Sequence, residues 1–349
     1  MPGNFVIMKY YVFICCFIAA TLTSCESNKA GRDGLHIAAT DSIELELGEP
    51  RAIYGYKNKL FVIDRKAIDN FIQIYDINTG EFLFSFAPMG QGPGEFSSLN
   101  SISIYNADDA VRLSLYDFGN KIATYDFSEV LSAKEEVMPI NVMYVSDTGL
   151  RMYGLSKTNN GYIASGRFRD GKFALLNDSL ELLKFTGEYR KKPKSSYPEE
   201  VHFMANYGRQ YFSEDRHYMA DCVTAASLLT LYEMKGNDLI KQWEYVIEDL
   251  NYDVEAGAVP VYKSNRGYAS VSIGNKYVYA IYSGEPAMTP DFCGKEVHVF
   301  DKMTGEMTKK FMLDRRSSHI VVDEDSRKMY IESDFPEPVV LIYDLDIEI

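Results

Sequence analysis

The chain repeats one short arrangement of residues, and no other feature of the sequence restricts the fold as strongly. In each copy an apolar strand is followed, after a gap, by a second strand that ends in an aromatic residue and an acid. The clearest copies pair residues 60–64 with 72–76, and residues 113–117 with 122–126. Strand-only repeats at intervals of about 40 to 65 residues are typical of a β-propeller, because each unit needs its neighbours to bury both of its faces.

Six copies can be counted along the chain. The remaining four are 217–221 with 229–233, 277–280 with 297–301, 329–332 with 340–344, and a degenerate copy, 161–164 with 172–177. The last copy ends too early to include an outer strand, whereas residues 42–47, ahead of the first copy, alternate as a strand does. Since an open sheet edge promotes aggregation, we expect this N-terminal strand to close the last blade. The sequence therefore predicts an all-β fold, a monomeric six-bladed β-propeller over residues 41–349 with its ring closed by an N-terminal strand.

The N-terminus has the features of an export signal. Lys9 precedes an apolar run over residues 10–22, and small residues lead from it to Cys25. The run is shorter than the roughly 20 residues that a spanning helix needs, so residues 1–24 are interpreted as a cleaved signal peptide. The rival interpretation is an uncleaved membrane anchor.

The residues that end at Cys25, Leu-Thr-Ser-Cys, resemble a bacterial lipobox. The resemblance implies that Cys25 is acylated and becomes the first residue of the mature protein. More than one acyl chain would anchor the protein stably to a lipid membrane. The polar, glycine-containing residues 25–40 would then form a flexible tether between the anchor and the propeller.

Removal of the signal would leave two cysteines in the mature protein, Cys222 and Cys293. Export would place them in an oxidising compartment, where a well-positioned pair forms a disulfide. One lies at a strand end and the other in a long insert of the next repeat, and a disulfide needs Cα atoms within about 7 Å of each other. We therefore predict that both remain thiols, with Cys222 the better buried.

The charge of the chain excludes one class of partner. The net charge is −14, and a nucleic-acid surface needs clustered Lys and Arg. One basic run, residues 190–194, lies between repeats next to a proline, and we interpret it as a solvated loop. We expect no nucleic-acid partner.

Two segments resemble known propeller families. Residues 90–96, Gly-Gln-Gly-Pro-Gly-Glu-Phe, resemble the inter-blade signature of NHL-type repeats. A later segment, residues 117–122, departs from those repeats, because it is one residue short and has Lys121 where arginine is usual. Residues 276–284 resemble the TolB-like six-bladed propeller lipoproteins of Bacteroidetes. This resemblance implies an exported lipoprotein of the outer membrane, facing either the periplasm or the cell surface.

Three acids occupy matching places in the repeat. Asp64, Asp117 and Asp221 each end the first strand of a copy, which we take as the inner strand of its blade. Such strand ends surround the channel of a propeller, so the three carboxylates are candidate ligands for Ca²⁺, which takes six to eight oxygens. The alternative is that they cap turns by accepting backbone hydrogen bonds. No other metal or cofactor is expected, because none of the five histidines is spaced as a zinc pair.

Two glycine- or acid-rich segments have plain structural interpretations. Residues 90–94 resemble a phosphate-binding loop, but such a loop needs a helix after it, and here a strand follows. We expect a connection between blades. Residues 323–328 lack the glycine and the final glutamate of an EF-hand loop, so a hairpin turn is expected.

Two long irregular segments are the candidates for recognition. Residues 282–295 include Tyr282 and Glu285, and residues 251–266 include Tyr262 and Arg266. Long loops on a rigid ring commonly carry binding function, and aromatic and arginine side chains suit a glycan or peptide partner. The alternative is ordinary connection between blades.

The sequence favours an exported lipoprotein that acts as a binding or scaffolding module for a protein, peptide or glycan. The alternative is a metal-assisted hydrolase or lyase with its site in the central funnel. A divalent ion held by Asp64, Asp117 or Asp221 would favour the enzyme, and exposed aromatic residues on one rim would favour the binding module. No residue is singled out by a catalytic motif.

Overall fold

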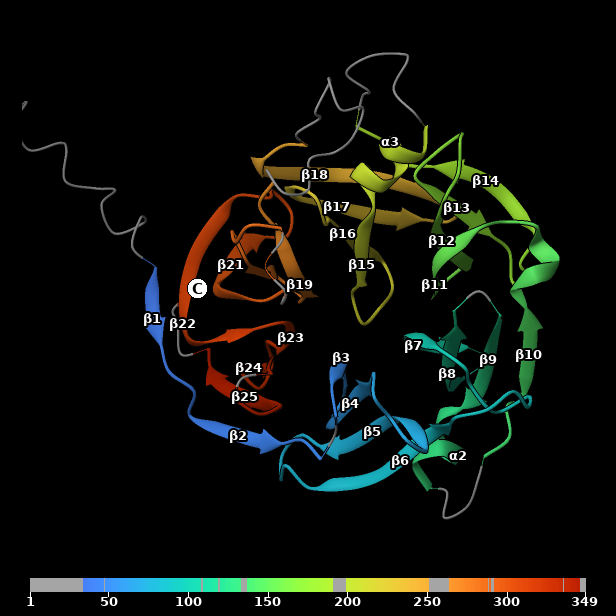
Figure 1. Cartoon of the computed structure of the whole chain (residues 1–349), viewed down its shortest axis with the longest axis horizontal. Helices are drawn as coiled ribbons and strands as arrows, with labels where there is room; N and C mark the ends of the chain where they lie inside the picture. Colours follow the sequence, from blue (N-terminus) through green and yellow to red (C-terminus); the bar gives the residue numbers. More distant parts are fainter. Residues whose placement is uncertain are drawn as a thin grey trace, which may run out of the picture.

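The structure, a computed structural model, describes residues 34–46, 48–107, 109–118, 120–132, 137–190, 199–250, 264–287, 289, 292–334 and 336–345. Six sheets stand around a central axis, one sheet in each blade (Figure 1). The predicted all-β, six-bladed propeller is therefore confirmed.

The blades follow one another in chain order. Blade 1 consists of β3 (Pro50–Tyr56), β4 (Lys59–Asp64), β5 (Asn70–Asp76) and β6 (Phe82–Pro88). Blade 2 consists of β7 (Leu99–Ala107), β8 (Ala110–Asp117), β9 (Lys121–Asp126) and β10 (Asn141–Tyr144). Blade 3 consists of β11 (Met152–Thr158), β12 (Gly161–Gly166), β13 (Phe173–Leu176) and β14 (Leu182–Thr186).

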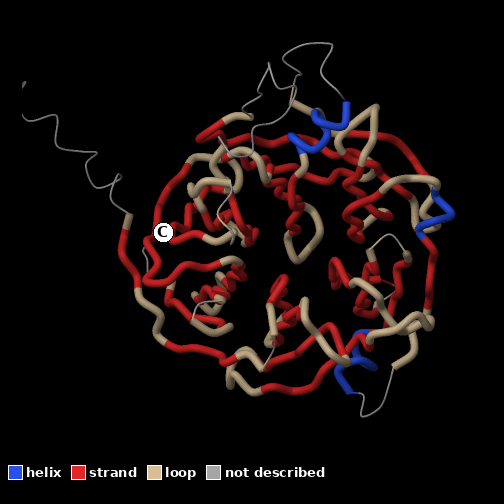
Figure 2. The backbone as a smooth tube through the Cα atoms, viewed as in Figure 1, coloured by secondary structure: helices blue, strands red, loops and turns tan. Residues whose placement is uncertain are grey.

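The second half of the ring is built in the same way. Blade 4 consists of β15 (Gly208–Phe212), β16 (Tyr218–Val223), β17 (Ser227–Lys235) and β18 (Asp238–Glu248). Blade 5 contains β19 (Tyr268–Ile273), β20 (Tyr277–Tyr282), β21 (Gly294–Asp301) and β22 (Met307–Ser317). Blade 6 contains β23 (His319–Asp323), β24 (Lys328–Ser333) and β25 (Val339–Asp344). Short helices, α2 (Phe127–Ser132), η1 (Val145–Thr148) and α3 (Glu199–Asn206), lie at the perimeter (Figure 2).

The N-terminal strand closes the ring, as predicted. β2 (Asp41–Glu44) pairs antiparallel with β25 and becomes the outer strand of blade 6. Ile43 faces Val340 in this register and is 2% exposed, so the closure also buries apolar surface. Just before it, β1 (Leu35–Ile37) pairs parallel with β22 as a fifth strand of blade 5. A strand thus lies inside the segment predicted as a tether, because the outer edge of β22 offers unpaired backbone groups.

The repeat in the sequence corresponds to the second and third strands of each blade, and its assignment to the inner strand was wrong. The innermost strands are β3, β7, β11, β15, β19 and β23, most of which contact their counterparts in the neighbouring blades (Figure 1). Middle strands such as β4 are covered on both faces and are almost wholly buried, whereas β3 borders the channel and mixes buried with partly exposed residues. The uniform apolar pattern therefore recurs only in the middle strands.

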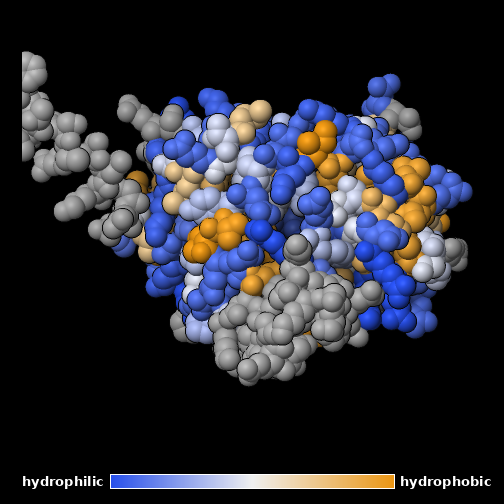
Figure 3. Space-filling model, turned by 90° about the horizontal axis from the view of Figure 1, so that it is seen from above, coloured by the Kyte–Doolittle hydropathy of each residue, from blue (hydrophilic) through white to orange (hydrophobic). Residues whose placement is uncertain are grey.

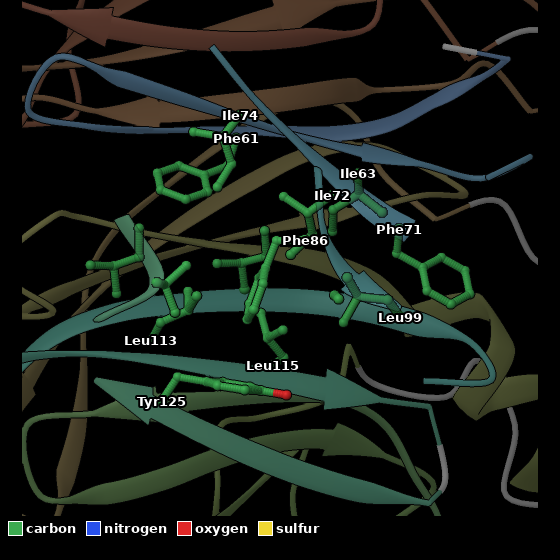
Figure 4. Packing of buried hydrophobic residues seen from close by; sticks show 14 of the residues in the cluster. Phe61, Ile63, Phe71, Ile72, Ile74, Phe86, Leu99, Leu113, Leu115 and Tyr125 are labelled. Carbon is green, nitrogen blue, oxygen red and sulfur yellow. The ribbon is translucent and has the colours of Figure 1, made fainter. Parts of the chain in front are cut away.

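The core lies between the blades. Phe61 and Ile63 of blade 1 pack with Leu113 and Leu115 of blade 2, all four fully buried (Figure 4). Phe86 meets Tyr125 edge to face at a ring-centroid distance of 5.0 Å. Such contacts repeat around the ring, so each blade depends on its neighbours.

The glycine-rich segment 90–94 connects blades 1 and 2, as expected. The Glu95 carboxylate accepts the backbone N–H groups of Gln91 and Gly92, both at 2.8 Å. A Cβ at Gly90 would lie 2.0 Å from that carboxylate, which explains the glycine. Lys121 is 1% exposed, and its ammonium donates to the Gly92 carbonyl oxygen. The buried lysine thus stabilises the connection between the two blades.

Three further predictions can be compared with the structure. Cys222 and Cys293 are 1% and 9% exposed and form no disulfide, which confirms two buried thiols with Cys222 the better buried. Residues 323–328 form the hairpin between β23 and β24, also as expected. The signal peptide and Cys25 lie outside the described residues, and within the part that is described no helix is long and apolar enough to cross a membrane.

The outer surface is predominantly polar. Seen from the side of the ring, hydrophobic residues form separate patches among hydrophilic ones (Figure 3). Exposed apolar side chains occur on the outer strands, including Leu182 and Leu183 of β14 and Ile240 and Ile247 of β18. Scattered apolar residues of this kind are normal on a protein surface and do not define an interface.

Candidate functional site

The two ends of the ring differ in composition. Because neighbouring strands of a blade are antiparallel, the starts of the first and third strands share one end with the ends of the second and fourth strands. Ten of the chain's fourteen arginines fall in the segments at this end, which we call the arginine face. They are Arg51, Arg65, Arg151, Arg167, Arg169, Arg190, Arg209, Arg266, Arg315 and Arg316. The opposite end, which we call the turn face, carries the hairpins that join the first strand to the second and the third to the fourth.

On the turn face, one hairpin extends across the channel. The loop between β15 and β16 reaches toward the axis (Figure 1), where the Arg216 Nε donates to the Ile104 carbonyl of β7 at 3.3 Å. Asn159 of blade 3 donates to the Asp215 carbonyl at 3.0 Å. Burial lowers the pKa of Arg216 to about 10. This hairpin therefore ties blade 4 to blades 2 and 3 at the turn face.

Arg51 and Arg209 lie near each other at the mouth of the channel, although they come from blades 1 and 4. The Arg51 Nη2 donates to Oδ1 of Asn100 at 2.5 Å, and the Arg209 Nη1 donates to the Ala269 carbonyl at 3.4 Å. Burial is the main cause of a lowered pKa at Arg51, and the positive charges of Arg65 and Arg209 lower it further. Two guanidinium groups within electrostatic reach of each other favour an anion between or above them.

A pair of carboxyl groups lies beside these arginines. Glu332 is fully buried and contacts the Ser318 hydroxyl and the His319 Nδ1, the latter at 2.9 Å. Burial raises the pKa of Glu332, while burial and the adjacent Glu332 raise the pKa of Asp334 to about 7. Burial, aided by Arg209, lowers the pKa of His319 to about 3. The histidine is therefore neutral at pH 7, and the raised pKa of the Asp334 carboxyl leaves that group only partly ionised there.

The structure brings Arg266 and Glu285 together, as two of the predicted recognition residues. The Arg266 backbone N–H donates to the Glu285 carbonyl at 2.8 Å, and the Glu285 carboxylate forms an ion pair with Arg316 at 2.7 Å. The Arg266 guanidinium lies 5.1 Å from the ring centre of Phe292, and Arg209 lies 5.0 Å from the same ring. The insert of blade 5 thereby extends the arginine cluster outward from the channel mouth.

The other two predicted recognition residues differ in their placement. Tyr282 stacks on His298 at a ring-centroid distance of 4.9 Å, and its hydroxyl lies 3.5 Å from that of Ser227. It therefore packs into the blade and not toward a ligand. Tyr262 lies outside the described residues.

Asp64 and Asp117 end the second strands β4 and β8, and Asp221 lies two residues before the end of the second strand β16. Asp64 accepts the backbone N–H groups of Gly48, Glu49 and Lys66 at 2.9 to 3.1 Å. These bonds are those that the turn-capping alternative expects.

The other two acids are bonded in a comparable way. Asp117 accepts the backbone N–H groups of Ser97 and Ser98 at 3.2 and 2.7 Å, and Asp221 forms a buried ion pair with Lys172. Among the described residues, no group of three or more His, Cys, Asp or Glu is arranged to hold a metal ion. The Ca²⁺ site therefore stays a prediction of the sequence, without a cluster of carboxylates to support it.

A cavity of about 330 Å³ lies between blades 1 and 2 at the arginine face. Its lining includes the guanidinium-bearing residues Arg51 and Arg65, with Asp64 and Ser98 beside them. The cavity lies next to the start of β3 and the end of β4, and its lining also includes the apolar residues Ile63, Phe71 and Leu99.

Sequence reasoning missed most of this site. Arg51, Arg151, Arg209 and Arg266 each lie within two residues of the start of an inner strand. That regularity is the signal that could have revealed the site, but it appears only after the inner strands have been located. The net charge of −14 also concealed it, because the acids are spread over the whole chain.

Comparisons with known proteins agree with the architecture. The family described as TolB-like 6-blade propeller-like matches residues 42–325. A structure of a protein described as exported, from Bacteroides fragilis, is 11% identical with a TM-score of 0.58, covering 89% of this chain and 93% of that chain. The Swd1 β-propeller domain from Myceliophteria thermophila is 10% identical with a TM-score of 0.52, covering 88% and 98%.

At such identities the two structures show a shared fold and nothing about ligands. No curated protein matches the sequence. The family match, in contrast, spans most of the ring, from the closing strand β2 to the β23–β24 hairpin. The chain therefore belongs to the TolB-like six-bladed propeller family.

Proposed function

We propose that the protein is an exported binding module that holds an acidic ligand, a glycan or a peptide, at its arginine face. The observation that carries the proposal is the environment of Arg51 and Arg209. Their hydrogen bonds go to an amide oxygen and a backbone carbonyl, and the two guanidinium groups lie within electrostatic reach of each other. An anionic ligand would supply the charge that these two guanidinium groups lack.

Binding measurements on wild-type protein and charge-removed variants test the proposal. The probes are an oligogalacturonate, a tetraglutamate peptide and a neutral oligosaccharide of the same length. The double variant Arg51→Gln/Arg209→Gln should lose at least tenfold in affinity for the anionic probe that binds, because hydrogen bonds to charged groups contribute about 1.5–3 kcal/mol. Rising salt should weaken binding to the wild type.

A matched control removes one charge from the turn face. Arg327 is exposed in the β23–β24 hairpin, and Arg327→Gln should leave the affinity unchanged. Equal binding of neutral and anionic probes, or full affinity in the double variant, would contradict the proposal. If both anionic probes bind, the tighter one identifies the ligand class.

Anchoring through Cys25 is part of the proposal. The lipobox-like residues before Cys25 support acylation, and the similar Bacteroides fragilis protein is described as exported. We place the protein at the outer membrane, with the ring joined to the lipid by the segment after Cys25. Cys25→Ala should move the protein to the soluble fraction while leaving the thermal unfolding midpoint unchanged. Retention on salt-washed membranes would favour an uncleaved anchor instead.

The carboxyl pair favours a second candidate, a hydrolase or lyase working at the channel mouth. Asp334, with a pKa of about 7 next to the buried Glu332, has the pKa of a general acid or base at neutral pH. Release of new reducing ends from a bound oligosaccharide, with and without added Ca²⁺, tests this candidate. Activity that is lost in Asp334→Asn would support this candidate. Intact oligosaccharide after long incubation would rule it out, and the binding module would remain as the proposed function.

A further inference from the structure

A second cavity lies on the arginine face, away from the channel mouth. It has a volume of about 400 Å³ and belongs to blade 3, where the start of β11, the loop after β12, the segment after β14 and α3 meet. We call it the blade-3 pocket. It falls at the small end of the range for ligand sites, about 300–1,000 Å³, so it suits a single ring-sized group.

Three arginines line the blade-3 pocket. Arg151 precedes β11, and Arg167 and Arg169 follow β12. A backbone hydrogen bond from the Arg167 N–H to the Arg151 carbonyl, 3.0 Å long, holds the two segments side by side. The approach is close enough that a Cβ at Gly166 would lie 2.3 Å from the Arg151 carbonyl oxygen. The backbone therefore fixes where the arginine side chains originate.

Aromatic side chains form another wall of the pocket. Tyr189 donates its hydroxyl to the Phe168 carbonyl at 3.0 Å and meets His202 edge to face at a ring-centroid distance of 5.6 Å. Phe203 stacks on Tyr153 at 5.4 Å. These contacts hold the wall in place before any ligand arrives, which reduces the entropic cost of binding.

The wall is also tied to the neighbouring backbone. Asn206 of α3 donates to the His202 carbonyl at 2.9 Å and accepts the Arg190 backbone N–H at 2.8 Å. Helix α3 is thus fastened to the segment that follows β14. The pocket has one charged side on the strand ends and one aromatic side on α3 and Tyr189.

We propose that the blade-3 pocket binds one acidic sugar residue. Arg151 would hold its carboxylate or sulfate group, because the planar guanidinium forms paired hydrogen bonds with such groups, and Arg167 and Arg169, which also have partners of their own, would add positive charge beside it. The sugar ring would lie against the aromatic wall. The inference rests on the proposed function and narrows it, since it makes the ligand of the arginine face an acidic glycan. An acidic peptide is disfavoured, because an extended backbone needs a groove or a free sheet edge and the pocket is compact.

The test uses small probes that match the size of this pocket, together with an acidic peptide for comparison. Methyl glucuronide, methyl glucoside, sodium sulfate and tetraglutamate are titrated into the wild type and into Arg151→Gln/Arg169→Gln, with affinities measured by calorimetry or NMR. The wild type should prefer the glucuronide, and the double variant should lose about tenfold or more of that affinity, the loss expected for charge-assisted hydrogen bonds. Both arginines are exposed, so the fold should persist, which a thermal unfolding scan checks.

Each contrary result overturns a stated part of the inference. Unchanged glucuronide affinity in the double variant would show that the arginines do not bind the ligand. If sulfate binds as tightly as the glucuronide, the sugar ring does not contribute to binding. If tetraglutamate binds more tightly, the ligand is not a glycan. Arg51→Gln/Arg209→Gln should keep the glucuronide affinity while losing the longer oligogalacturonate. If that variant loses the oligomer and the blade-3 variant loses neither probe, the proposed function stands and the pocket assignment fails; if no anion binds the wild type, both fail.

Discussion

The turn face and the arginine face solve the problem of polar groups in opposite ways. On the turn face, the hairpins satisfy their own backbone. Asp76 accepts the N–H groups of Asn78 and Thr79, and Asp301 accepts those of Met303 and Thr304, at 2.8 to 3.3 Å. These turns are capped by an acid of their own hairpin, and the neighbouring hairpin adds bonds such as that from the Ile77 N–H to the Asn58 carbonyl.

The arginine face leaves polar atoms unsatisfied. Among the described residues, five buried side-chain atoms have no hydrogen-bond partner, and all five belong to segments of this face. They are Arg190 Nε, Thr224 Oγ1, Ser283 Oγ, Arg316 Nε and Glu332 Oε1. Each such atom costs on the order of 1–3 kcal/mol. The difference teaches that stability is concentrated at one end of the ring and that the other end keeps polar groups at an energetic cost, as binding sites commonly do.

The largest effect should come from opening the ring, which both faces share. Deleting residues 41–44 removes β2 from blade 6 and exposes β25 as an edge. We expect that unfolding is no longer cooperative. We also expect soluble aggregates to appear on size exclusion. The graded variant Ile43→Ala should cost about 2–4 kcal/mol, the usual range for a core truncation. A monomeric deletion variant with an unchanged unfolding midpoint would mean that the ring does not depend on this strand.

The next largest effect tests the stability of the turn face. Gly305 has φ +73°, and a Cβ there would lie 2.5 Å from the Trp243 ring, so Gly305→Ala should cost about 2–5 kcal/mol from strain and overpacking. Gly236 has φ +58° with nothing within 4 Å, so Gly236→Ala should cost only about 1–2 kcal/mol. Urea unfolding measures both. Neither variant should change the affinity for an anionic probe, and a change would blur the distinction between the faces.

A smaller, pH-dependent effect is expected at the channel mouth. The pKa of Asp334 is about 7 in the folded protein against 3.8 for the free group, so the folded state binds the extra proton and this carboxyl makes folding less favourable as pH rises from about 4 to about 7. Asp334→Asn should therefore gain stability relative to the wild type over that interval.

The neighbouring histidine acts in the opposite direction. The pKa of His319 falls to about 3 from 6.5, so its contribution to folding grows as pH rises between those values. The wild type should show a shallow net slope and the Asp334→Asn variant a steeper rise toward pH 6.5, both measured by urea unfolding at pH 4.5 and 6.5. Parallel curves would show that Asp334 is an ordinary surface carboxyl.

The smallest effect should follow removal of the mouth arginines. Both side chains reach solvent, although the Arg51 guanidinium is partly desolvated, so Arg51→Gln/Arg209→Gln should change the unfolding free energy by no more than about 0.5 kcal/mol. A substantial loss of stability would mean that these arginines serve the fold and not a ligand.

The sequence was sufficient for the ring and insufficient for the site. The repeated strands, the closing strand and the two buried thiols were all predictable, because each depends on a local pattern or on simple chain geometry. Arg266 and Glu285 were singled out as candidates in two long segments, and their role in binding stays a prediction. The packing of Tyr282 could not be predicted, since its aromatic ring gives no indication of whether it faces solvent or, as observed, His298.

The sequence alone determined how many blades this chain forms and how they close, because apolar periodicity and chain order are properties of neighbouring residues. Only the tertiary structure decided that Arg51 and Arg209, 158 positions apart in the chain, influence each other's charge. It also decided that Arg151, Arg167 and Arg169 face an aromatic wall built from α3 and Tyr189. The physical reason is that a propeller brings the starts of six inner strands to one end of a ring, and the resulting charge density depends on distances in space that no sequence interval encodes.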